Sequence, residues 1–147
     1  MSDRFPVITG VGVIAAPGCG MAEIWPALAA NQSGLRPLTL FQSPRYGQLP
    51  VGEITCDLTT LGAPGSGSRS DRLAWIAARD ALRSAGLEPK TVADRTGVLL
   101  GSSVGGTFDT ERFLTALIKH RKLRARPTRF HECSSPVDLV ADSFGLF

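Results

Sequence analysis

Cysteine, histidine and long apolar runs are all scarce in this sequence. Its 147 residues include two His and three Cys, Cys19, Cys56 and Cys133, whose spacing matches no metal-ligand pattern. We therefore expect no metal, no other cofactor and a reduced, cytoplasmic chain rather than a disulfide-rich secreted one. No apolar run approaches the roughly 20 residues that cross a bilayer, and no signal-peptide pattern opens the chain, so we expect no membrane partner.

The composition indicates a globular domain with an uneven charge. Hydrophobic residues make up 43% and charged residues 20% of the chain, which is typical of a folded domain, and the length suits one domain over 1–147. The net charge is +3, and six of the sixteen Lys and Arg residues lie between 119 and 129. Aromatic side chains do not interleave with them, so we expect this segment to dock an acidic protein rather than nucleic acid.

The hydrophobic pattern predicts an α/β fold. Near-continuous apolar runs at Phe5–Ala16 and Val98–Leu100 are typical of strands buried on both faces, and 35–41 and 51–56 read as weaker extended segments. Helical spacing predicts four helices, of which the second begins after an N-cap at Ser70 and stops at Gly86. The predicted helices are Met21–Ala30, Asp71–Ala85, Asp109–His120 and Ser135–Ser143.

Two glycines near the start, Gly10 and Gly12, allow two interpretations. After a strand, such glycines can bring the backbone close to the pyrophosphate of a dinucleotide. However, Pro17 intervenes, and no acidic residue follows about twenty positions on, where a dinucleotide site needs one. The pattern therefore favours glycines that let the segment pack closely under a helix.

A Gly- and Ser-rich loop, 101–106, follows the strand predicted at 98–100. Such a loop can line a pocket with backbone N–H groups and small side chains, or can be a plain turn into the next helix. Ser102 and Ser103 have no base nearby in sequence, so we do not expect either to act as a nucleophile.

Cys133 is the one residue that resembles a thiol nucleophile. A helix predicted to begin just after it, and His131 two residues away, could favour the thiolate. Glu132 is adjacent and opposes that effect. We therefore predict a small, partly buried Cys133 with no catalytic role, and we expect His120, which lies among cations, to be solvated.

With these residues in view, the chain resembles the N-terminal half of the β-ketoacyl-acyl-carrier-protein synthases, the condensing enzymes of fatty acid and polyketide synthesis. The likeness rests on an ordered set of segments that together span nearly the whole chain. They are Val7–Val13, Ile24-Trp25 with Ser33–Pro37, Ser70–Arg72 with Ala85–Leu87, Gly97–Gly106, and Asp138–Leu146.

The resemblance implies a thiolase-like fold of two αβαβα halves and a dimer, of which this chain forms most of one half. It also implies covalent chemistry, in which a Cys takes the acyl chain and two His assist decarboxylation. In the family that Cys lies in a Thr-Ala-Cys-Ser-Ser type motif after a Gly-Pro, whereas this sequence ends at Phe147. We therefore assign no catalytic residue and expect a fragment or split piece that is inactive alone.

The resemblance also implies two kinds of binding residue. Val104, with Gly105 and Gly106, matches the wall of the acyl-chain pocket, and Phe130–Pro136 matches a region near that pocket and the dimer interface. Basic residues fall near segments that face the acidic acyl carrier protein in the family. These carrier-docking candidates are Arg69, Arg72, Arg124, Arg126 and Arg129.

Two other functions stay open from the sequence: a non-catalytic subunit that binds the carrier protein or acyl chain, and an unrelated nucleotide-binding domain. The resemblance further implies that one sheet edge and an apolar face lack their usual covering. We therefore expect a homodimer or a partner chain that supplies the missing half, and poor solubility when the chain is alone.

Overall fold

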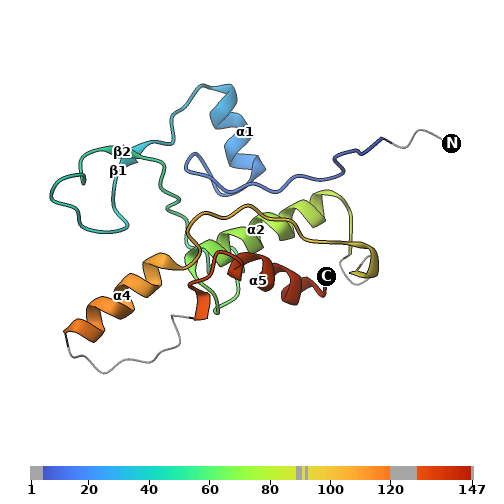
Figure 1. Ribbon diagram of the computed structural model, residues 1–147. Helices are drawn as coiled ribbons and strands as arrows, with labels where there is room; N and C mark the ends of the chain where they lie inside the picture. The colour runs from blue at the N-terminus through green and yellow to red at the C-terminus, as the bar shows by residue number, and fades with distance from the viewer. Residues whose placement is uncertain (1–4, 89–90, 92, 120–128, 147) are drawn as a thin grey trace.

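The helix α2 (Arg69–Ser84) is the element on which much of the chain packs, as Figure 1 shows. The computed structural model describes residues 5–88, 91, 93–119 and 129–146. Within these ranges the other elements are α1 (Met21–Ala29), β1 (Arg36–Pro37), β2 (Pro50–Val51), the 3₁₀ turn η1 (Ala93–Arg95), α4 (Thr107–Ile118) and α5 (Ser135–Phe144). The four predicted helices are thus confirmed to within a few residues at each end.

α2 begins at a capping box rather than at the predicted cap. Ser68, not Ser70, is the N-cap, because its backbone is extended and its hydroxyl accepts the Asp71 N–H at 3.2 Å. Asp71 in turn accepts the Ser68 N–H at 2.6 Å, so each residue satisfies a donor of the other. At the other end Gly86 adopts a left-handed φ of 66°, which confirms the predicted stop.

The core forms where α2 meets the loop that precedes it. Ile76 is fully buried against Leu58 and Ala63, which are 3% and 7% exposed. On a neighbouring face of α2, Trp75 stacks on Phe144 of α5 with ring centroids 5.6 Å apart. Within the loop 61–68, Ala63 and Ser68 are therefore buried, whereas Gly62, Gly65 and Ser66 stay exposed.

The strands predicted at Phe5–Ala16 and Val98–Leu100 are wrong for the described chain. Neither segment forms a strand there; the sheet consists of β1 and β2 alone, paired antiparallel with Arg36 opposite Val51. The physical reason is that a strand exists only through hydrogen bonds to a neighbour, and no described segment forms a ladder with either run; Ala15 makes an isolated bridge to Gly18. Of the weaker segments predicted at 35–41 and 51–56, only Arg36–Pro37 and Val51 lie in strands.

Gly10 and Gly12 lie against the backbone of α2. A methyl group on Gly10 would collide with the Ala81 carbonyl, and one on Gly12 with the Ala77 carbonyl. Only glycine permits this approach, so the interpretation as packing glycines is confirmed. Because both positions face a helix at van der Waals distance, the nucleotide-binding interpretation loses the residues that suggested it.

Many large apolar side chains stay exposed. Ile8 is 88% exposed, Leu99 97% and Ile118 77%, and α4 buries none of its residues. Ile8 and Leu99 lie in the apolar runs predicted to be strands, and Ile118 lies at the end of α4. Uncovered apolar surface, as expected from the sequence, is therefore present. No helix in the described part of the chain is long and apolar enough to cross a membrane.

Candidate functional site

The loop 101–106 lies against the segment 130–133. Gly105 (φ 48°) and Gly106 are buried, and a methyl group on either would collide with the main chain of residues 130–132. Ser70 of α2 holds the loop by donating a hydrogen bond from its hydroxyl to the Gly105 carbonyl at 2.9 Å. The two glycines therefore shape the loop through close backbone packing.

Val104 stands at the outer edge of this loop and is 60% exposed. Its neighbours Gly105 and Gly106 are covered by the 130–132 backbone, so of the three predicted pocket residues only Val104 offers a side chain to a ligand. An exposed valine beside a glycine turn can form one wall of an apolar pocket if a second surface faces it.

A buried carboxylate, Asp71, connects α2 to α5 beside this loop. Besides capping α2 it accepts the Ser135 hydroxyl at 2.9 Å, which fastens the start of α5. Asp71 is fully buried, and its second oxygen, Oδ1, makes no hydrogen bond. Sequence analysis missed this role, although the Ser68-x-x-Asp71 spacing is a recognisable capping-box signal.

Cys133 is exposed, which makes the prediction of partial burial wrong. Its Sγ lies 3.7 Å from the Ser103 carbonyl, and the His131 Nδ1 bonds to Thr110 Oγ1 at 3.1 Å instead of to the thiol. Among the described residues, no imidazole is therefore bonded to Cys133. His120, together with Arg124 and Arg126, falls outside the described residues.

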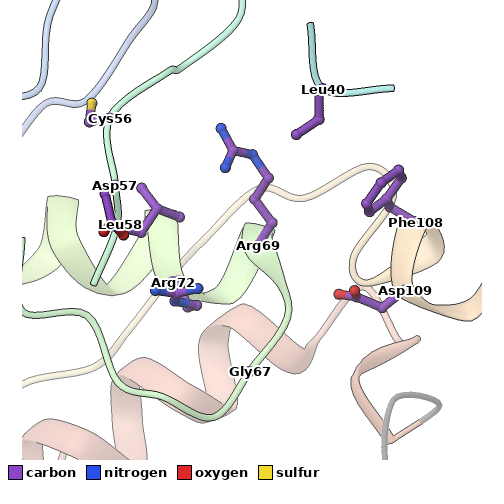
Figure 2. Close-up of a pocket in the computed structure, with 9 residues that line it drawn as sticks. All are labelled: Leu40, Cys56, Asp57, Leu58, Gly67, Arg69, Arg72, Phe108 and Asp109. Carbon is purple, nitrogen blue, oxygen red and sulfur yellow. The ribbon is translucent and has the colours of Figure 1, made fainter. Parts of the chain in front are cut away.

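Arg69 and Arg72, two of the predicted docking residues, share one pocket of about 370 Å³ (Figure 2). Both rise from the first turn of α2, and α4 contributes Phe108 and Asp109 to the other side. The remaining lining residues come from segments before α2. They are Leu40, Cys56, Asp57, Leu58 and Gly67.

Both arginines already hold local structure. The Arg69 guanidinium donates to the Ile54 carbonyl, and Arg72 donates to Thr59 Oγ1 at 2.9 Å. The Nε of Arg72 is buried without a hydrogen bond. Arg129, by contrast, is exposed and covers only the ring of Phe130, at 5.1 Å, so its charge is available to a partner.

Two carboxylates, Glu53 and Asp57, stabilise the segment 52–60, to which both arginines donate hydrogen bonds. The Thr39 backbone N–H donates to Glu53 and holds the pKa of that carboxyl below its usual 4.5. The Thr59 backbone N–H donates to Asp57 and likewise holds the pKa of that carboxyl below its usual 3.8. The bonds measure 2.7 and 2.8 Å. Hydrogen bonds to the ionised form favour it, so both groups support the loop at neutral pH.

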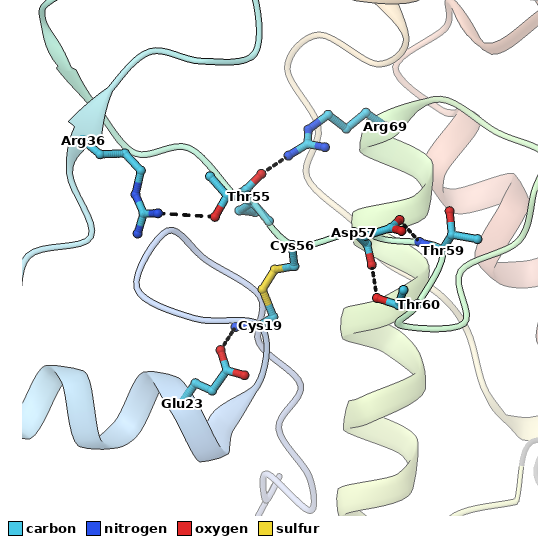
Figure 3. Close-up of a disulfide and its surroundings, with 10 residues drawn as sticks. Cys19, Glu23, Arg36, Thr55, Cys56, Asp57, Thr59, Thr60 and Arg69 are labelled. Carbon is cyan, nitrogen blue, oxygen red and sulfur yellow. Dashed lines mark hydrogen bonds between the residues drawn. A yellow bond between two sulfur atoms is a disulfide. The ribbon is translucent and has the colours of Figure 1, made fainter.

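A disulfide joins Cys19 to Cys56, 37 positions apart, with a Cα–Cα distance of 6.5 Å (Figure 3). The expectation of a fully reduced chain is therefore wrong for this pair. Counting cysteines could not reveal it, because nothing in the local sequence indicates that the loop before α1 meets the loop before α2. Among the described residues, no group of three His, Cys, Asp or Glu side chains is placed to hold a metal.

The sequence profile described as "Beta-ketoacyl synthase, N-terminal domain" matches residues 6–137. The chain belongs to the β-ketoacyl synthase family. It is 40% identical over 116 residues to the tetracenomycin polyketide synthase ketoacyl synthase alpha subunit of Streptomyces glaucescens, covering 76% of this chain. It is 33% identical over 129 residues to 3-oxoacyl-[acyl-carrier-protein] synthase 2 of Coxiella burnetii, covering 80%.

The solved structures agree with this β-ketoacyl synthase assignment. The ishigamide ketosynthase/chain length factor superposes on 95% of the chain with a TM-score of 0.82 and 26% identity. The described residues are thus a partial ketosynthase fold, with helices and a small sheet. The chain spans 27% of the Streptomyces relative, 30% of the Coxiella relative and 37% of the ishigamide protein.

Proposed function

We propose that this chain is a fragment or split piece of a 3-oxoacyl-acyl-carrier-protein synthase of polyketide or fatty acid synthesis. The complete enzyme would perform acyl transfer with decarboxylative carbon–carbon bond formation. The chain alone is inactive and works in the cytoplasm as one incomplete domain. The observation that carries the proposal is the contact of the 101–106 loop with segment 130–133, which leaves Val104 exposed as one wall of an acyl pocket.

The missing chemistry supports the inactivity. The thiol beside the loop, Cys133, has no hydrogen bond to His131, the histidine of the described residues, which bonds to Thr110 instead. A thiol nucleophile needs a base or a positive neighbour to form the thiolate. A second copy would cover exposed apolar side chains, and a partner chain that supplies the rest of the fold would also contribute the nucleophile.

Incubation with acyl- and malonyl-loaded carrier protein tests the absence of chemistry. Mass spectrometry is expected to find no acyl group on Cys133 and no condensed product. A C133S variant serves as the control, since it should behave identically. An acyl adduct that forms on the unaltered chain and is lost in C133S would show that Cys133 is catalytic and would refute the proposal.

Docking of the acyl carrier protein forms the second part of the proposal. Arg129 is exposed, Arg69 and Arg72 share the pocket in Figure 2, and Arg124 and Arg126 belong to the same basic segment as Arg129. Such a cluster suits an acidic partner through charge complementarity. A charge reversal, R129E, should weaken carrier binding about tenfold and reduce its salt dependence.

R45E provides the matched control for R129E. Arg45 is also an exposed arginine that covers a ring, that of Tyr46 at 5.1 Å, but it lies outside the pocket and the basic segment. R45E should leave carrier binding unchanged, as measured by titration calorimetry. Equal effects of R129E and R45E would mean that only net charge matters and would contradict a defined docking face.

A non-catalytic subunit that binds the carrier or the acyl chain is the second candidate function. The observation that favours it is the similarity to a ketosynthase/chain length factor structure. Co-expression with a complete ketosynthase distinguishes the two. A non-catalytic subunit would join an active complex whose nucleophile belongs entirely to the other chain, whereas a split piece would restore activity only to a chain lacking the N-terminal part.

A further inference from the structure

The Cys19–Cys56 disulfide joins the turn before α1 to the segment that precedes α2. Cys19 lies in a turn closed by Ala15 and Gly18, and its N–H bonds to Glu23 of α1 at 3.0 Å. Cys56 lies in the segment 52–60, which precedes α2. Figure 1 places α1 apart from the α2–α5 pair, and Figure 3 shows the disulfide crossing from one part to the other.

Each cysteine is anchored to its own side. Next to Cys56, Leu58 is buried in the core, and Ile54 accepts the hydrogen bond from Arg69 of α2. The Cys19 turn is fastened to α1 instead. The disulfide adds a covalent restraint to the contacts that already hold the 52–60 segment near the turn before α1, namely the β1–β2 pairing, the Arg36–Thr55 hydrogen bond and the packing of Gly52 on Ala16.

The sulfur atoms are reachable. Both cysteines are only partly buried, and Cys56 itself lines the pocket that holds Arg69 and Arg72. A small thiol can therefore approach Cys56 from this pocket, whose lining Cys56 shares with the two arginines (Figure 2). Partly exposed disulfides are the ones that exchange readily with thiols.

We propose that Cys19 and Cys56 form a reversible thiol–disulfide exchange site for small-molecule thiols and disulfides of the glutathione class. To close the site, one cysteine thiolate attacks the small disulfide and forms a mixed disulfide, releasing one small thiol. The second cysteine then attacks the mixed disulfide and releases the other. The cysteine pair loses two electrons and two protons, and the small disulfide is reduced to two thiols. Closure orders the 52–60 segment.

Equilibration in glutathione buffers of graded ratio tests the exchange. A C133S background removes the third thiol, and acid quenching followed by alkylation counts free thiols by mass. As the buffer becomes more oxidising, we expect the number of free thiols per chain to fall from two to none in a single transition. In the C19S and C56S variants, each made in the C133S background, the remaining cysteine should carry glutathione instead. Free thiols that persist at full oxidation, or a bond that glutathione never opens, would overturn the proposal.

Hydrogen exchange tests the structural consequence. In the reduced C133S chain, amides of 52–60 should exchange about tenfold or more faster than in the oxidised chain, because the restraint is gone. Amides of α5, which is held to α2 by Asp71 and the Trp75 stack, should not change. Identical exchange of 52–60 in both forms would refute the ordering role.

A link to carrier docking rests on the proposed function above. If the carrier binds at the arginine pocket, the oxidised chain should bind it several-fold more tightly than the reduced chain. Loss of all carrier binding in both forms would count against the docking proposal alone, since the thiol counts and hydrogen exchange measure the site without any carrier protein. Equal, measurable binding in both forms would overturn the link.

Discussion

Asp71 is a buried residue whose side chain joins two helices, α2 and α5. One of its oxygens caps α2 and holds Ser135 at the start of α5, and Ser70 beside it fixes the 101–106 loop. The other oxygen is buried without a partner. A buried carboxylate in this position is costly unless its remaining bonds are kept, so the residue is sensitive to any change.

Replacing Asp71 by Ala should lower the free energy of unfolding by about 2–4 kcal/mol, because a helix cap is lost and the Ser135 hydroxyl is left buried without an acceptor. Denaturant titration followed by the fluorescence of Trp75, which stacks on α5, measures the loss. Ser134 is exposed, and its hydroxyl donates to Glu132 at 3.4 Å, a contact within one surface turn. The control S134A should therefore change stability by less than about 0.5 kcal/mol.

Glu53 should make stability depend on acidity. Its pKa in the folded chain lies below the usual 4.5, so its stabilising contribution is complete above that value and is lost as pH falls through the lower pKa of the folded state. The E53Q variant should therefore lose less stability than the unaltered chain between neutral and acid pH. Thermal melts across this range measure the difference.

Glu111 gives the matched control for E53Q, since it lies exposed on α4 and outside the Thr39 contact. E111Q should keep the acid sensitivity of the unaltered chain. Parallel pH profiles for E53Q and the unaltered chain would contradict the role given to the Thr39 bonds.

At the scale of elements, helices were predictable and strands were not. The stripe and stop signals of α2 are local: Ile76 falls on the buried face, and Gly86 ends the helix through its own φ. The run at 98–100 has a strand's composition, but Leu99 is 97% exposed because no described segment pairs with it. The sequence indicates which residues suit a strand, but whether a strand forms depends on a neighbouring segment that the rest of the fold must supply.

The same division applies to the candidate site. The contact between 101–106 and 130–133 could be anticipated only through resemblance to a family, since the spacing of two loops says nothing about their meeting. The close approach of Gly10 and Gly12 to a helix was accessible from the residues themselves. The meeting of Cys19 with Cys56 was accessible from neither, because it joins two irregular loops.

Replacing Gly12 by Ala tests the approach to α2. The added methyl group would meet the Ala77 carbonyl, so the 5–16 segment must move away, and stability should fall by about 1–3 kcal/mol. Gly65 has open space around it and no unusual φ. G65A should leave stability unchanged or raise it slightly, by restricting the unfolded chain. Equal denaturation midpoints for G12A and G65A would contradict the packing role.

For the whole molecule, the disulfide is a main contributor to stability. It closes a loop of 37 positions, and restricting the unfolded chain to that extent is worth up to about 4 kcal/mol. A C19S/C56S double variant should unfold at correspondingly lower denaturant concentration than the oxidised chain, and at the same concentration as the reduced one. A double variant as stable as the oxidised chain would show that the bond constrains nothing.

The exposed apolar side chains predict association at the same scale. Ile8, Leu99 and Ile118 are each more than three-quarters exposed, and uncovered apolar surface favours contact with other chains. Size-exclusion chromatography coupled to light scattering should find dimers or larger species when the chain is alone. A monodisperse monomer that resists proteolysis would contradict this expectation.

Pairing Cys19 with Cys56 leaves Cys133 as the sole thiol of the oxidised chain, and that thiol is exposed beside Ser103. A maleimide dye will therefore attach at one defined place without any engineered cysteine. From there its emission reports on the surroundings of the Val104 loop. The protein thus carries its own attachment point for an optical probe with which the arrival of a carrier protein or acyl chain can be followed in real time.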